Sequence, residues 1–189
     1  MADQLYLSYW LRGFTEFNML RHFETLLRKF PFSRLRPQAL LRVYALERVE
    51  PPALEQSIAA PVDPEQIIRL ARQYHHADCA YFVETAWDLW QFEGDWRLRP
   101  SSIALACFGP LFPSELGEQL RIEFGLESQF LPQSDTRAPL APVRHNIRAL
   151  LHLVEDLDAA LPVDRRTLWS EGGENFAERL QAALARESD

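Results

Sequence analysis

One stretch of the sequence, residues 79–110, constrains the fold of this chain more than any other. Residues 79–92 are rich in aromatic and β-branched side chains, which suit a pleated, half-buried surface. They are followed by Glu93-Gly94-Asp95, a short break with a glycine that is typical of a hairpin loop. The sequence therefore predicts a long central β-hairpin over residues 79–109, with Phe92 opposite Trp96. Pro100 cannot donate to a strand ladder, so we expect a bulge or a sheet edge there.

The first strand of this hairpin has two unlike faces, because side chains alternate along a strand. Trp87 lies on one face, and Glu84, Asp88 and Trp90 lie on the other. Two carboxylates on one face could serve as a catalytic acid and base. However, four residues of strand separate them by ~13 Å, and glycoside hydrolysis needs ~5–9.5 Å. We therefore expect ion pairing with Arg42 or Arg99, or contact with a ligand, and the sequence assigns no catalytic residue.

The rest of the chain alternates between strand-like and helix-like patterns. Alternation with period two predicts further strands at residues 5–11, 39–46 and 119–126. Apolar residues at helical spacing predict helices at residues 16–30, from 64, at 143–161 and from 174. The intervening stretches read as connections, among them residues 48–63, with three prolines, and residues 163–172.

These elements predict one α+β domain over residues 1–189. Its core would be a mostly antiparallel, twisted sheet of five strands, with the hairpin at its centre and about four helices packed on it. The chain is long enough to bury a core of ordinary size. Whether residues 48–63 form an ordered loop is left open by the sequence.

Composition limits the classes of partner. The net charge of −7 argues against general affinity for nucleic acid. No apolar run approaches the ~18 residues of a membrane span, and the first residues do not resemble a signal sequence. Two cysteines are too few for a disulfide scaffold. We therefore expect a cytoplasmic protein that binds neither nucleic acid nor a membrane.

The densest group of potential metal ligands is His75-His76-Ala77-Asp78-Cys79. Its spacing fits no known ligand motif, and histidine is electrostatically favourable at the end of a helix. We therefore expect no metal and no cofactor. Cys79 and Cys107 are interpreted as buried free thiols, and the sequence does not decide whether they are neighbours.

Two hypotheses about function follow. The first is a non-enzymatic binding or self-assembling domain, because an aromatic-rich sheet with helices on one side leaves a face for a partner or for a homodimer. The alternative is a small-molecule-binding domain or enzyme with a pocket between the sheet and the C-terminal helices. The candidate ligand-binding residues are Arg42, Tyr44, Glu84, Trp87, Asp88 and Trp90.

Overall fold

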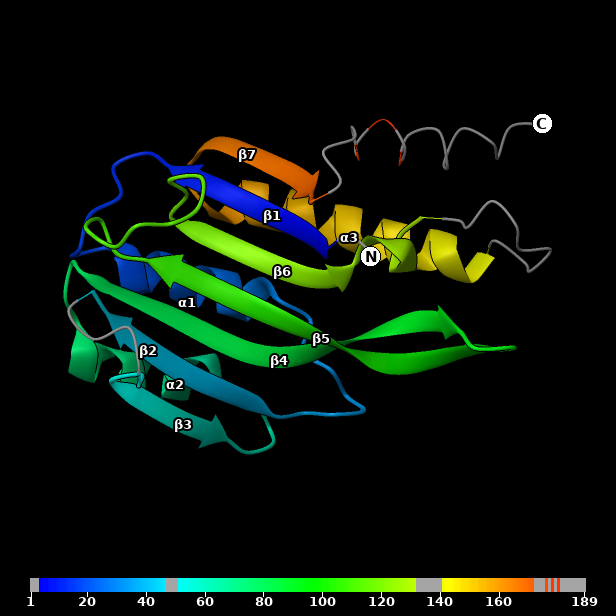
Figure 1. The fold of residues 1–189 in the computed structure, drawn as a ribbon, viewed down its shortest axis with the longest axis horizontal. Coiled ribbons are helices and arrows are strands. Elements are labelled where there is room, and N and C mark those ends of the chain that lie inside the picture. Colours follow the sequence, from blue (N-terminus) through cyan, green and yellow to red (C-terminus); the bar gives the residue numbers. More distant parts are fainter. Residues whose placement is uncertain are drawn as a thin grey trace.

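The centre of the molecule is a seven-stranded antiparallel sheet. The structure, a computed structural model, describes residues 4–46, 51–131 and 141–171, and also residues 176, 178 and 180. The strand order is β3-β2-β4-β5-β6-β1-β7, so the hairpin lies in the middle (Figure 1). Within the described residues, the helices lie behind one face of the sheet, and no helix covers the other face (Figure 1). We call this uncovered side the open face.

The strands and helices follow one another along the chain in the order β1-α1-β2-β3-α2-β4-β5-β6-α3-β7. The strands are β1 (Gln4–Leu11), β2 (Ala39–Ala45), β3 (Leu54–Ile58), β4 (Cys79–Phe92), β5 (Trp96–Phe108), β6 (Leu120–Leu126) and β7 (Val163–Ser170). The helices are α1 (Met19–Lys29), α2 (Pro64–Ala71) and α3 (Ala141–Ala160).

Local chemistry explains where α2 begins. Asp63 caps α2 by accepting a hydrogen bond from the backbone N–H of Glu65, an arrangement typical of an acidic residue before a first-turn proline. Helix α1 starts at Met19 rather than at residue 16. Asn18 takes the N-cap position there, and Phe17, inside the predicted helix at residues 16–30, lies before the observed helix and is 84% exposed.

The prediction of a five-stranded sheet with about four helices is wrong. The sheet has seven strands, and the described part of the chain holds three α-helices. The additional strands, β3 and β7, come from stretches interpreted as connections, and both lie at the edges of the sheet. Their exposed, polar residues lack the apolar alternation of an internal strand. The last predicted helix, from residue 174, falls mostly outside the described residues.

The hairpin itself forms with the predicted register. Phe92 pairs with Trp96, Tyr81 pairs with Cys107, and the pairing between β4 and β5 continues without a shift. Pro100 therefore produces no bulge. Cys79 and Cys107 are free and buried among the side chains of the core.

The outer half of the hairpin extends beyond its neighbouring strands as an arm (Figure 1). Pairing with β2 ends at Glu84, and pairing with β6 ends at Ala104. Beyond these points, the side chain of Asn146 on α3 bonds both the backbone N–H and the backbone C=O of Trp90, at 2.9 Å each. The arm is thus attached to the helical layer on its β4 side.

The space between the sheet and the helices is filled by apolar side chains. Trp87 is 5% exposed and contacts the rings of Phe30, Phe124 and Phe130, with centroids about 6 Å apart. Helix α3 contributes a buried stripe to this layer. Because the layer between the sheet and the helices is densely packed, the open face is the side of the sheet on which a ligand can be held.

Candidate functional site

The open face carries a groove with small residues along its floor. Its volume is about 980 Å³, and it spans strands from β3 to β1. Ser102, Ala104 and Gly125 line it from β5 and β6. Gly125 adopts a φ of 75°, next to a register shift in the pairing of β6 with β1. A left-handed backbone favours glycine. Because glycine has no side chain, this irregularity also leaves the floor of the groove unfilled at Gly125.

Two glutamates flank the floor of the groove. In the sheet register, Glu84 on β4 lies opposite Ala104, and Glu123 on β6 lies opposite the same alanine on its other side. Neighbouring strands are ~5 Å apart, so the two carboxylates project from positions ~10 Å apart across the groove. Both residues line the groove.

Glu84 belongs to a group of three charges on β2, β3 and β4. Arg42 forms ion pairs with Glu84 and, at 2.7 Å, with Glu55. Hydrogen bonding to Glu55 raises the pKa of Arg42, so the guanidinium stays charged. Since two carboxylates share one guanidinium, this group carries one excess negative charge.

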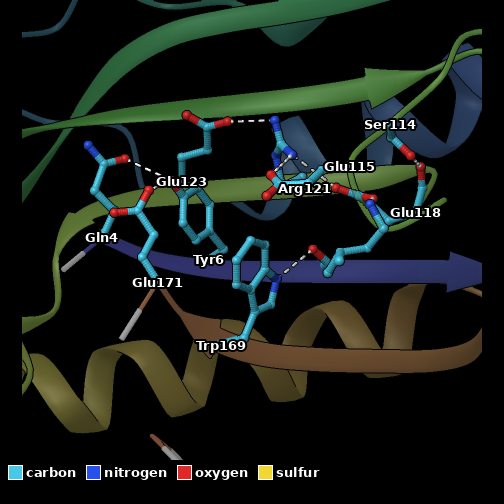
Figure 2. A network of polar contacts seen from close by, with 11 residues as sticks. Gln4, Tyr6, Ser114, Glu115, Glu118, Arg121, Glu123, Trp169 and Glu171 are labelled. Atoms are coloured by element: carbon cyan, nitrogen blue, oxygen red, sulfur yellow. Dashed lines mark hydrogen bonds and ion pairs between the residues drawn. The ribbon is translucent and has the colours of Figure 1, made fainter. Parts of the chain in front are cut away.

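Glu123 belongs to a larger network centred on Arg121 (Figure 2). The Arg121 guanidinium contacts Glu118 at 3.1 Å, Glu123 at 2.9 Å and Glu115 at 3.5 Å. It also lies over the rings of Tyr6 and Phe108. The Glu118 side chain is fully buried, and its carboxylate also accepts the backbone N–H of Leu116. Three carboxylates share one guanidinium here, which leaves two excess negative charges.

Tyr6 connects this network to the outer strand of the sheet. Its ring stacks on Trp169 with centroids 4.4 Å apart, and its hydroxyl bonds Gln4 and Glu171 at 3.0 Å each (Figure 2). Burial, followed by the hydrogen bond to Glu171, raises the pKa of Tyr6 to about 12. The phenol therefore stays neutral at physiological pH.

Arg36 is the cation of the groove. It approaches from the connection between α1 and β2, and its guanidinium bonds the Ser102 hydroxyl at 3.2 Å. Among the residues that the structure describes, no carboxylate lies within ion-pair distance of Arg36. One end of the groove is therefore positive, while the Glu84 and Glu123 clusters make its middle negative.

The structure brings together only some of the predicted ligand-binding residues. Arg42 and Glu84 are joined by an ion pair on the open face, and Tyr44 is near them, edge-on to Phe82 at 5.6 Å. Trp87 points into the core on the opposite face. Trp90 lies on the hairpin arm, six residues beyond Glu84 and therefore ~20 Å away along the strand.

Asp88 is held by a loop rather than directed at a ligand. Its carboxylate accepts hydrogen bonds from the Ser33 hydroxyl and from the backbone N–H groups of Arg34 and Leu35. Since Glu84 is bonded to Arg42, Glu84 and Asp88 are engaged by different partners and do not converge on one point.

Within the described ranges, no group of three or more His, Cys, Asp or Glu side chains could hold a metal ion. His75 bonds the backbone C=O of Glu16, and His76 lies 3.8 Å from Asp78. Burial raises the pKa of both Cys79 and Cys107, whereas a nucleophilic thiol needs a lowered pKa.

Ser102, Ala104 and Glu123 line the groove and were not singled out by the sequence. Arg121, which pairs with Glu123, was not singled out either. The alternation of polar and apolar residues in β6 does place Arg121 and Glu123 on one polar face of the strand. No sequence pattern indicates that Arg36 crosses to Ser102, because the two lie 66 residues apart and on different elements.

Comparison of the chain with protein-family models, curated proteins and solved structures finds no match. Among the described residues, no helix has the length and apolar character that a membrane span requires. The fold is an α+β arrangement of a single antiparallel sheet with helices on one face, and what it does must be argued from the groove itself.

Proposed function

We propose that this protein is a non-enzymatic binding protein whose recognition surface is the open face of the central sheet. The observation that carries the proposal is the groove on that face, which has a volume of about 980 Å³. Ligand sites in proteins typically have volumes of ~300–1,000 Å³ and combine an apolar lining with a few placed polar groups. Ala104 and Leu40 supply apolar surface, and Arg36 and Ser102 supply polar groups.

The contacts and burial of the reactive side chains support a binding function better than a catalytic one. Glu84 and Asp88 each bond a different structural partner, and both cysteine thiols are buried. A general acid and base must reach the same reacting group, within ~3 Å of the proton that each one transfers.

The alternative pocket between the sheet and the C-terminal helices has weaker support. That layer contains Trp87, Phe124 and Phe130 in mutual contact, and α3 adds its buried stripe. A homodimer through the open face is the self-assembling form of the main proposal. Leu111 and Leu116, in the connection between β5 and β6, are 68% and 45% exposed and offer apolar surface for such an association.

An Ala104→Arg substitution tests the proposal. The new side chain would fill the groove and place a guanidinium between Glu84 and Glu123, where it would find ion-pair partners. A mixture of small fragments would be screened against the wild type by ligand-observed NMR. We expect the fragments that bind the wild type to lose binding to A104R, and any self-association to weaken in sedimentation velocity.

The matched control is Glu155→Arg, which places the same side chain on the exposed surface of α3. This variant should bind the same fragments as the wild type. Fragments that bind A104R as well as the wild type, with both variants folded by circular dichroism, would show that the open face is not the recognition surface.

A further inference from the structure

The groove has an excess of negative charge around Glu84 and Glu123 and a separate positive charge at Arg36. Arg42 is shared by two carboxylates and Arg121 by three, so the groups that contain Glu84 and Glu123 carry one and two excess negative charges. Arg36 carries a positive charge with no carboxylate partner among the described residues, and its contact is the neutral Ser102 hydroxyl. A ligand that balances this pattern must carry charges of both signs.

The positions of these charges set the length of such a ligand. Arg36 contacts Ser102, and the two glutamates flank Ala104, two residues further along β5. Two residues of strand rise ~7 Å. A fully extended dipeptide also spans ~7 Å. Its terminal carboxylate can therefore meet Arg36 while its terminal ammonium lies between Glu84 and Glu123.

We propose that the groove binds short peptides with free termini, recognised through both the C-terminal carboxylate and the N-terminal ammonium. The inference rests on the proposed binding function and names the class of ligand. Arginine binds a carboxylate through paired N–H donors, and hydrogen bonds between charged groups are about twice as strong as neutral ones. The groove volume of about 980 Å³ leaves room for the peptide side chains, and the small residues of the floor allow its backbone to approach.

Capped forms of one peptide separate the two contacts. Alanyl-alanine, its N-acetyl form and its C-terminal amide would each be titrated into the ¹⁵N-labelled protein at pH 7, up to millimolar concentration. We expect the free dipeptide to shift the amide signals of Ser102, Ala104 and Gly125, and each cap to weaken binding at least tenfold.

Two variants assign each contact to its residue. Arg36→Gln should bind the free dipeptide as weakly as the wild type binds the amide, and should not change binding of the amide. The double variant Glu84→Gln with Glu123→Gln should lose the effect of N-acetylation. Glu155→Gln, on the exposed surface of α3, is the control and should behave as the wild type.

Three results would overturn the inference. The first is an amide that binds as tightly as the free dipeptide, which would show that the groove takes a plain cation. The second is a set of shifted signals outside the groove, and the third is no binding of the free dipeptide. If the fragments still bind the open face in an A104R-sensitive manner, only the class of ligand is wrong. If they do not, the binding function fails as well.

Discussion

At the scale of single residues, Asp88 has a structural role that its sequence position does not reveal. Its carboxylate accepts three hydrogen bonds from residues 33–35, and Ser33 in turn accepts the backbone N–H of Arg36. The carboxylate thus holds the turn from which Arg36 reaches into the groove. Asp88, which the sequence predicts as a ligand contact, instead acts on the groove indirectly, through the turn that positions Arg36.

Asp88→Asn is expected to lower the free energy of unfolding by about 2 kcal/mol. The amide keeps one acceptor oxygen but presents its NH₂ group to donors, and a hydrogen bond to a charged group is worth ~1.5–3 kcal/mol. Urea unfolding monitored by tryptophan fluorescence measures the change. Asp156→Asn, at an exposed position on α3, is the control and should change the stability little. Equal stability of D88N and the wild type would contradict the role given to Asp88.

At the scale of elements, the arm of the hairpin is attached on its β4 side, and within the described residues no strand pairs with the outer edge of its β5 side. The backbone of Trp90 points away from β5, because it bonds Asn146. Its partner Leu98 therefore also points its N–H and C=O away from β4, and Pro100 shares this direction two residues later. The proline thus lacks its N–H at the outer edge of β5, where a free donor would invite another strand.

Pro100→Thr should increase self-association, since it adds a free N–H donor to this edge beside Leu98, which is 42% exposed. Sedimentation velocity over a range of protein concentrations would show a larger share of dimers or higher oligomers than in the wild type. Gln91→Thr adds the same side chain to β4 at a position whose backbone faces β5, and serves as the control. Association in P100T no greater than in Q91T would count against this view of the edge.

At the scale of the whole molecule, the sheet buries three tyrosines in a way that links stability to alkaline pH. Burial is the main cause of the raised pKa of Tyr6, Tyr9 and Tyr81. The hydroxyl of Tyr81 also donates to the backbone C=O of Tyr74 at 2.8 Å. In each case the fold favours the neutral phenol over the phenolate.

The stability that comes from these phenols is present in full below pH 10, the ordinary pKa of tyrosine. The contribution of Tyr6 is lost as the pH rises through about 12, its pKa in the fold, and the contributions of Tyr9 and Tyr81, whose pKa is raised further, are lost at higher pH. The absorbance of tyrosinate at ~295 nm, followed together with near-ultraviolet circular dichroism, should show part of the tyrosine ionising only as the fold is lost. Tyr6→Phe should reduce that part by one residue. Ionisation of every tyrosine near pH 10 with the fold intact would contradict the burial of these rings.

The sequence by itself determined the elements whose signals are local. Alternation and the Glu93–Asp95 turn specify the hairpin and its register, and Asp63 before Pro64 specifies the start of α2. Tertiary structure decided the rest. Strands β3 and β7 are polar and exist because β2 and β1 offer them backbone partners, which no local pattern records. Trp87 and Glu84 share a strand but lie on opposite faces, and the helices determine which face is left open. The groove is a consequence of long-range placement, because its negative groups come from β4 and β6 and its positive group comes from the connection that brings Arg36 to Ser102 on β5.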